Sequence, residues 1–270
     1  MKPSDHISDY KQTAARIRRV VLTMVHAAKA SHISSCLSCV DLLTVLYIKI
    51  VNIDSELKED RDRVIFSKGW AAATAYAFLA EKGIIPKEDL ATYCQEGSKY
   101  IGLVERSVRG IEASTGSMGH GLPIGLGMAL GAKRSGSKWK TYILMSDGEM
   151  DCGTTWESAL IASNHQLDNL MVIVDCNRWQ AIGRTEAVLN LEPLTDKWRS
   201  FGWDVREIDG HNFEAIEKAL SAPTREQPVV VIANTIKGKG VSFMEDKVIY
   251  LYKNTSDQEY QRALEELNAQ

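Results

Sequence analysis

Short apolar runs alternate with longer amphipathic stretches along this chain of 270 residues. Apolar runs of a few residues, bounded by polar residues or glycine, are typical of parallel strands that are covered on both faces. Four such runs and one mixed run predict strands at 64–66, 142–145, 170–174, 204–208 and 229–232.

The stretches between these strands have the periodicity and the end signals of helices. The predicted helices are 8–29, 39–50, 71–82, 154–165, 213–220 and 256–267. Glycines punctuate 116–132, which is compatible with close helix packing and with close approach of the backbone to a ligand. Because strands and helices alternate, the sequence predicts an α/β fold, a doubly wound parallel sheet with helices on both faces. We expect a single domain that spans 1–270.

Polar residues follow two of the predicted strands where each strand ends. Ser146-Asp147-Gly148-Glu149 follows one, and Asn177, thirty positions after Asp147, follows the next. The carboxyl ends of parallel strands in one βαβ unit open onto the same crevice, so Asp147 and Asn177 can meet on one cation. Their hard oxygens suit Mg²⁺ or Ca²⁺, and Mg²⁺ usually carries phosphates, so the pattern indicates a diphosphate cofactor. The alternative is that both are ordinary turn or cap residues.

Composition narrows the class of protein further. Apolar residues make up 44% of the chain and charged residues 25%, which is ordinary for a globular protein. The net charge of −3 predicts no attraction to nucleic acid or to a membrane, and no apolar run approaches the roughly 20 residues that span a bilayer. Five cysteines, an odd count, argue against a disulfide framework, and the N-terminal residues contain no signal-peptide core. We therefore expect a cytoplasmic protein.

Several longer stretches resemble the N-terminal, diphosphate-binding half of transketolases that are split into two polypeptides. The resemblance covers nearly all of the chain, and its motifs together are far more specific than one Asp-Gly pair. The matching stretches are 29–47, 62–69, 112–122, 146–177 and 237–244.

The resemblance implies thiamine diphosphate as the cofactor, held through Mg²⁺ (or Ca²⁺). The implied metal ligands are Asp147, the Asn177 side chain and the Trp179 backbone carbonyl. The other implied cofactor-binding positions are Trp70, Gly116, Ser117, Met118, Ser146, Gly148, Glu149 and Lys237. The backbone at 116–118 is expected to face the aminopyrimidine ring. His32 and Glu157 are the implied proton-transfer residues, and Glu157 would belong to a carboxylate chain that links paired cofactor sites.

The resemblance also implies a partner chain. In the family, a pyrimidine-binding domain supplies the glutamate that activates the cofactor, and we expect that domain on a separate polypeptide, in an α₂β₂ assembly. The implied reaction is transfer of a two-carbon unit, ketol or acyl, from a small keto donor to an aldehyde or ketone acceptor. The cofactor performs this chemistry, while the protein orients it and selects the substrates.

Three family positions that normally carry histidine are apolar here, namely Trp70, Leu103 and Leu251. Imidazoles bind hydroxyls and phosphates, so their loss would leave the hydroxyls of a sugar donor unpaired. One alternative is therefore acyl transfer or acyloin formation from a 2-oxo acid such as pyruvate, in sugar or natural-product biosynthesis. A second alternative is a non-catalytic subunit that only binds a partner, and a subunit of a 2-oxo acid dehydrogenase is a more distant one.

Overall fold

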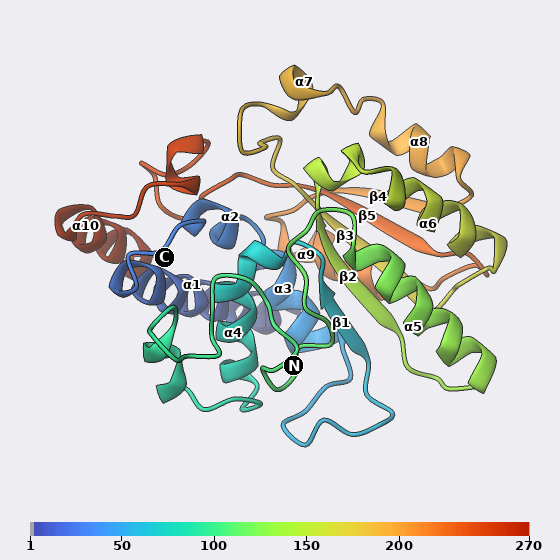
Figure 1. Cartoon of the computed structure of the whole chain (residues 1–270), viewed down its shortest axis with the longest axis horizontal. Helices are drawn as coiled ribbons and strands as arrows, with labels where there is room; N and C mark the ends of the chain where they lie inside the picture. The colour runs from blue at the N-terminus through green and yellow to red at the C-terminus, as the bar shows by residue number, and fades with distance from the viewer. Residues whose placement is uncertain (1–2, 270) are drawn as a thin grey trace.

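A five-stranded sheet with strand order β1-β2-β3-β5-β4 forms the centre of the molecule (Figure 1). The computed structural model describes residues 3–269. The strands are β1 (Arg63–Phe66), β2 (Thr141–Ser146), β3 (Leu170–Cys176), β4 (Asp204–Asp209) and β5 (Val229–Asn234). Every neighbouring pair is parallel. These strands confirm the predicted doubly wound parallel sheet.

Six longer helices connect and cover the strands. They are α1 (Pro3–Ala27), α4 (Ala72–Glu81), α5 (Gly121–Ser135), α6 (Gly153–Asn164), α9 (Phe213–Ser221) and α10 (Asp257–Asn268). Each of them overlaps a helix or glycine-punctuated stretch expected from the sequence. No helix among the described residues is long and apolar enough to cross a membrane.

The shorter helical elements depart from the expectation. They are α2 (Ile33–Ser38), α3 (Val40–Val45), η1 (Leu46–Ile50), η2 (Gly69–Ala71), η3 (Glu88–Thr92), η4 (Asp147–Asp151), α7 (Thr185–Val188), α8 (Leu194–Ser200) and η5 (Val248–Leu251). The stretch expected as one helix, 39–50, is the short helix α3 followed by a π-helical turn, η1. Elements as short as α7 and α8 contain too few residues for a periodic signal, so the sequence did not reveal them.

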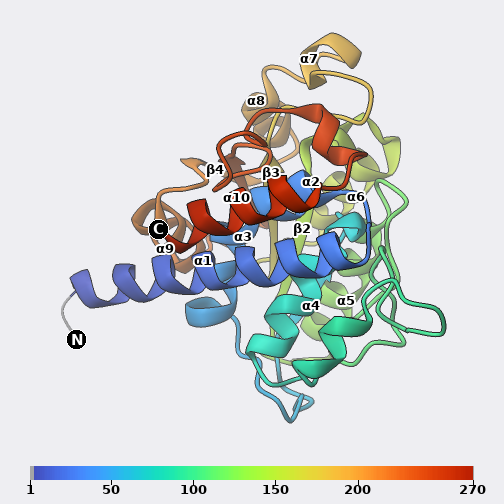
Figure 2. The same ribbon diagram turned by 90° about the vertical axis from the view of Figure 1, so that its left-hand side faces the viewer.

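Two hydrophobic layers hold the helices against the sheet. Strand residues alternate between them, so that Tyr142 and Leu144 pack with α1, α3 and α4, while Ile143 and Met145 pack with α5 and α6. Figure 2 shows α1 and α10 lying side by side on the outside of the first layer. Both faces of the central strands are therefore covered, as their continuous apolar runs predicted.

The carboxyl ends of four strands meet at one edge of the sheet. Ser67 and Lys68 follow β1, Asp147 follows β2, Asn177 follows β3, and residues 235–237 follow β5. The register pairs Ser146 at the end of β2 with Asp175 in β3. In open α/β sheets ligands bind at this edge, so the fold brings the predicted site residues to the expected place.

Candidate functional site

A cavity of about 410 Å³ opens at the carboxyl edge of the sheet. Its wall comes from segments that lie far apart in the sequence. The lining residues are His32, Ser35, Lys68, Trp70, Gly116, Met118, Ser146, Gly148, Asn177, Trp179, Gln180, Ala181, Ile182, Lys237 and Leu251. Nine of the candidates named from the sequence are in this lining, so the fold gathers most of the expected site around one space.

Asp147 is buried, between two residues that line this cavity, Ser146 and Gly148. Asp147 itself lines a smaller, separate cavity of about 280 Å³. Its carboxylate accepts hydrogen bonds from the backbone N–H of Gly148 (3.0 Å), the backbone N–H of Arg178 (2.8 Å) and the Thr185 hydroxyl (2.9 Å). Burial raises the pKa of Asp147 to about 6, although the Thr185 bond opposes the shift. Within the described residues no cationic side chain forms a salt bridge to it, so a bound cation would supply the missing positive charge.

Asn177 and Trp179 stand at the start of a tight hairpin that follows β3. The Asn177 side-chain oxygen accepts the Trp179 backbone N–H at 3.1 Å, and Trp179 forms an antiparallel bridge with Arg184. The hairpin returns to Asp147 through Thr185. The backbone of Arg178, which lies between the two implied ligand positions, therefore contacts the carboxylate that follows β2.

Three basic side chains line the cavity close to one another. Lys237 is buried and donates a hydrogen bond to the Ser35 hydroxyl at 3.1 Å. Burial, together with the nearby Lys68 ammonium, lowers the pKa of Lys237 to about 8. Burial and the charges of Lys237 and Lys68 lower the pKa of His32, whose Nδ1 lies 2.7 Å from the Ser31 hydroxyl. This region suits a ligand with several negative charges.

Lys68 is already neutralised by a buried partner. Its ammonium contacts the Asp175 carboxylate at 2.5 Å and also donates to the Ser35 carbonyl and the Ser38 hydroxyl. Burial is the largest single effect and works to raise the pKa of Asp175. The Lys68 charge and the hydrogen bonds from Lys68, Ser38 and Thr235 together outweigh burial and hold that pKa below its ordinary value. Lys237, which lacks such a carboxylate, is therefore the cation more available to a ligand.

The loop before α5 brings backbone to the cavity. Gly116 has a φ of +146°, and a Cβ added there would lie 2.7 Å from the Leu103 side chain. Gly116 and Met118 line the cavity, whereas Ser117 is exposed beside it. The positive φ and the contact with Leu103 explain why only glycine fits at this point.

Glu149 lies outside the cavity lining and supports the loop from behind. It is completely buried, and its carboxylate accepts hydrogen bonds from the Ser67 hydroxyl, the Gly119 backbone N–H (3.2 Å) and the Ser146 backbone N–H (2.9 Å). Glu149 therefore lies behind the cavity wall. Its carboxylate oxygens are occupied by hydrogen bonds that fix the backbone at Gly119 and at Ser146.

The three positions that are apolar in place of histidine surround the same space. Trp70 and Leu251 line the cavity, and Leu103, which is 41% exposed, covers Gly116 at its mouth. Leu251 is fixed by its carbonyl, which accepts the His32 backbone N–H at 2.7 Å. An apolar wall therefore adjoins the basic region around His32.

Glu157 is not part of this cavity. It lies on the outer face of α6 and is partly exposed, near Leu160 and Ile161, which are exposed on the same helix. The neighbouring helix α5 presents Gly127 and Gly131 outward, and a Cβ added at either glycine would meet no atom within 4 Å. Glu157 therefore lies on an exposed face of α6, away from the cavity lining.

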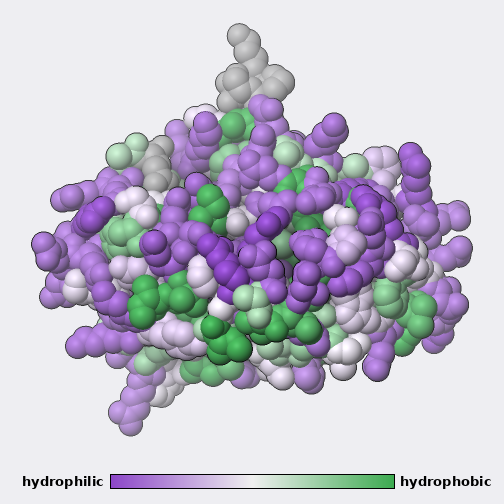
Figure 3. All heavy atoms as spheres, turned by 90° about the horizontal axis from the view of Figure 1, so that it is seen from above, coloured by the Kyte–Doolittle hydropathy of each residue, from purple (hydrophilic) through white to green (hydrophobic). Residues whose placement is uncertain are grey.

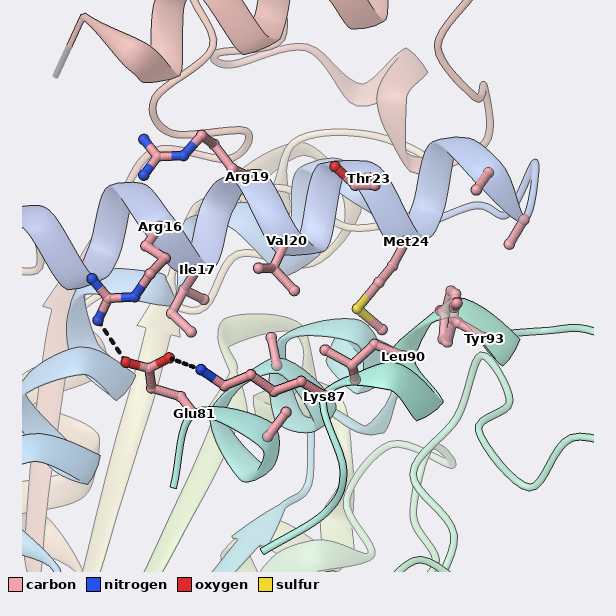
Figure 4. Close-up of a pocket in the computed structure, with 15 residues that line it drawn as sticks. Arg16, Ile17, Arg19, Val20, Thr23, Met24, Glu81, Lys87, Leu90 and Tyr93 are labelled. Carbon is pink, nitrogen blue, oxygen red and sulfur yellow. Dashed lines mark hydrogen bonds and ion pairs between the residues drawn. The ribbon is translucent and has the colours of Figure 1, made fainter. Parts of the chain in front are cut away.

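A second large cavity, of about 460 Å³, lies between α1, α4 and η3 (Figure 4). Ile17, Val20, Met24 and Leu90 point into it, and alanines form much of the remaining wall. At its rim Glu81 pairs with Arg16 at 2.5 Å and with Lys87 at 3.7 Å. Its surface is mostly apolar, so we place the candidate site at the strand ends.

Five lining residues had no assigned role in the sequence interpretation, namely Ser35, Lys68, Gln180, Ala181 and Ile182. Lys68 carried an available signal, because a lysine two residues after a buried strand lies at the ligand-binding edge of a parallel sheet. Ser35 lies on a short helix and the other three lie in the hairpin after Asn177, where position depends on loop geometry that no local pattern encodes.

Comparisons with known proteins agree with this geometry. Residues 9–249 match the family described as transketolase, thiamine diphosphate binding domain. The chain is 41% identical to one of the subunits of apulose-4-phosphate transketolase from Actinobacillus succinogenes, over 95% of each chain. It is 36% identical to the SqwG subunit of 6-deoxy-6-sulfo-D-fructose transketolase from a Clostridium species, over 98% of each chain.

Solved structures show the same fold. Transketolase from Campylobacter jejuni superposes with a TM-score of 0.89 at 30% identity, over 96% of this chain and 43% of that one. The chain thus spans less than half the length of that solved transketolase, and it covers almost the whole length of the curated subunits. By sequence and by fold, this chain belongs to the transketolase family, of which it carries the thiamine diphosphate binding domain.

Proposed function

We propose that this chain is the diphosphate-binding subunit of a two-chain transketolase-like enzyme that uses thiamine diphosphate and Mg²⁺ to transfer a two-carbon unit. The observation that carries the proposal is the buried Asp147 carboxylate, which accepts the backbone N–H of Arg178, the residue after Asn177, beside a cavity that Asn177 and the buried Lys237 line. A metal–diphosphate group suits a carboxylate that forms no ion pair among the described residues, beside a buried lysine, Lys237, whose charge no ion pair there neutralises.

The residues present fit that group. Asp147, the Asn177 side-chain oxygen and the Trp179 carbonyl would hold Mg²⁺, which prefers oxygen ligands and keeps several sites for phosphate and water. Lys237 would contact the diphosphate. Gly116 would let the backbone approach the aminopyrimidine ring closely, since it has no side chain between the backbone and the cavity.

The chain's own residues would then orient and protect the reacting groups. When bound, thiamine diphosphate supplies the chemistry that breaks the C–C bond beside a ketose carbonyl. His32, at the cavity wall, would donate or accept a proton at a substrate oxygen, and burial keeps its imidazole neutral over a wider pH range by lowering its pKa. Trp70 and Leu251 would exclude water from one side of the substrate.

A partner chain would complete the site. The cavity is open, and hydrophobic side chains are exposed at and near its mouth, including Met118 (45%), Leu103 (41%) and Ile182 (83%). Figure 3 shows hydrophobic residues gathered across the lower part of the face seen from above, below a mostly hydrophilic region. Exposed apolar patches of this kind mark protein interfaces. The pyrimidine-binding domain, on a separate chain, would cover this surface.

Two copies of the assembled pair would meet through α5 and α6. Leu160 (60% exposed) and Ile161 (44%) form an outward apolar face beside Gly127 and Gly131, which allow close helix approach. Glu157 lies on the same helix, where a carboxylate chain between paired sites would pass. An α₂β₂ assembly with twofold symmetry would cover the apolar face of α6 and would also bring Glu157 between the paired sites.

The donor would be a ketose, in keeping with relatives that are named for apulose 4-phosphate and 6-deoxy-6-sulfo-D-fructose. A second candidate is acyl transfer from a 2-oxo acid such as pyruvate, and the apolar wall of Trp70 and Leu251 favours it. A panel of donors given to the reconstituted pair decides between them. Turnover of ketose phosphates without turnover of pyruvate supports ketol transfer, and the reverse supports the second candidate.

The decisive test of cofactor use is calorimetric titration of the co-purified two-chain complex with thiamine diphosphate and Mg²⁺. We expect binding that requires both chains and is lost in Asp147→Ala. The matched control is Asp168→Ala, which removes a half-exposed carboxylate far from the cavity. A folded complex that binds no cofactor would instead support a non-catalytic, partner-binding role.

A further inference from the structure

Two separate loops close over the metal end of the cavity. One is the hairpin 177–185, in which the Gln180 backbone N–H donates to the Gly183 carbonyl at 2.9 Å and the Thr185 N–H donates to the Arg178 carbonyl at 3.1 Å. The other is the loop 237–246, which begins at Lys237. The chain does not connect them directly, since more than fifty residues and two strands lie between.

Asp246 joins the two loops through its side chain. Its carboxylate accepts the Trp179 indole N–H at 2.6 Å and forms a two-pronged ion pair with Arg184, at 2.7 and 2.5 Å. The Arg184 guanidinium also stacks over the Trp179 ring, 4.0 Å from its centre. The carboxylate therefore contacts both ends of the bridge that closes the hairpin.

The backbone of Asp246 is fixed at the same time. Its N–H donates to the Lys237 carbonyl at 2.8 Å, and its φ of +58° is one that aspartate tolerates better than most residues. Gly238, with a φ of +78°, allows this turn, because a Cβ there would lie 2.5 Å from the Met244 carbonyl oxygen. One residue thus contacts the loop of Lys237 by its backbone and the hairpin of Trp179 by its side chain.

We propose that Asp246 is a positioning residue that fixes the hairpin 177–185 to the Lys237 loop, so that the metal ligands after β3 and the diphosphate-binding lysine are held in one geometry. The inference rests on the proposed function for what the two loops bind. Asp246 would act through Trp179 and Arg184 and would touch no cofactor atom itself.

The exposure of the contact indicates that its effect is local. The side chains of Arg184 and Asp246 are 38% and 52% exposed, and ion pairs this exposed add little to global stability. A supporting partner of a metal ligand acts differently, because it sets ligand orientation, and its loss commonly weakens metal binding by about 10-fold to 100-fold.

The first experiment measures amide hydrogen exchange in the co-purified two-chain complex without cofactor. We expect Asp246→Ala to speed exchange in the hairpin by about tenfold, since the locally opened state is then more populated, and to leave the central strands unchanged. Arg184→Gln should reproduce the effect. Asp196→Ala, which removes a more exposed ion pair with Arg199 on α8, is the control. Unchanged exchange in Asp246→Ala overturns the inference.

The second experiment titrates the same variants with thiamine diphosphate and Mg²⁺. Asp246→Ala should weaken binding by about tenfold, and it should lower the melting temperature only slightly, because alanine tolerates the left-handed backbone at this position less well than aspartate. Asp246→Asn, which keeps an acceptor for Trp179 but loses the ion pair, should fall between it and the wild type. A loosened hairpin with unaltered affinity also contradicts the positioning role. If the wild-type complex binds no cofactor, the proposed function fails, and the exchange result alone still decides whether Asp246 restrains the hairpin.

Discussion

Lys68 and Asp175 form an ion pair across β2, joining the ends of two strands, β1 and β3, that are not neighbours in the sheet. Their side chains are 1% and 0% exposed, and the two charged atoms are 2.5 Å apart. The Ser38 hydroxyl donates to the same carboxylate oxygen at 2.6 Å, while the Thr235 hydroxyl donates to the other. The pair therefore fixes the floor of the cavity from beneath.

Breaking this pair should destabilise the fold strongly. Lys68→Met leaves the Asp175 charge buried without a partner, and we expect a loss of about 3–5 kcal/mol in the free energy of unfolding, measured by urea denaturation. Lys133→Met removes a half-exposed pair with Asp168, so its effect should stay within about 1 kcal/mol. Equal effects of the two substitutions would contradict the assigned role of the buried pair.

Lys237 should make cofactor binding depend on pH. Its pKa of about 8 lies below the ordinary lysine value, so the side chain is mostly neutral at pH 9. A bound diphosphate favours the charged form and raises that pKa. Binding at pH 9 should therefore take up close to one proton, and affinity should fall as pH rises through 8.

Calorimetry in two buffers with different ionisation enthalpies measures this proton uptake directly. Lys237→Met should abolish the uptake at pH 9 and weaken binding at pH 7. Lys239→Met, two residues further along, removes a partly exposed lysine that pairs with Glu245 at 3.3 Å, and it should preserve the uptake. Uptake that persists in Lys237→Met would assign the proton to another group.

Replacing two glycines on α5 by alanine should have different effects on the stability of the protein. A Cβ at Gly121 would lie 2.2 Å from the Ser67 Cβ and 2.6 Å from its Cα, so Gly121→Ala should cost about 1–3 kcal/mol of stability through overpacking. In the separate chain a Cβ at Gly127 meets no atom within 4 Å, so in that form Gly127→Ala should be neutral or stabilise the helix by up to about 1 kcal/mol. Urea unfolding of both variants measures the two changes in stability. A loss of stability in Gly127→Ala comparable to that in Gly121→Ala would refute the prediction.

The outer face of α6 should control assembly. Leu160→Glu with Ile161→Glu places charge on the apolar surface proposed to join two pairs, so the α₂β₂ complex should separate into αβ pairs. Light scattering with size-exclusion chromatography measures the mass. Ile48→Glu, at a 43% exposed residue in η1, is the control and should keep the full mass. An intact tetramer in the double variant would place the contact elsewhere.

Much of the fold was predictable because the sheet is covered on both faces. Runs such as 142–145 and 170–174 are apolar throughout since every residue in β2 and β3 is buried, and that pattern is local in the sequence. The ends of those strands then placed Asp147 and Asn177 at the same edge. Local pattern and general topology were together sufficient for this part of the site.

The remaining part of the site depends on contacts that no local pattern records. The resemblance implied Glu149 as a cofactor-binding residue, and the structure buries its carboxylate against Ser67 and Gly119, which lie 82 and 30 positions away in the sequence. The contact of Asp246 with Trp179 spans 67 positions and depends on a left-handed turn at Asp246 itself. Such geometry is set by loop conformation, which sequence spacing does not encode.

The open mouth of the cavity has a consequence for how the protein is made. Under the two-chain arrangement, Ile182, Met118 and Leu103 remain in water until the second polypeptide covers them. Molecules of this chain synthesised in excess would then associate through those side chains and be lost to precipitation or degradation. Matched synthesis of the two polypeptides would keep the free pool small, and recombinant yield should rise when both are expressed together.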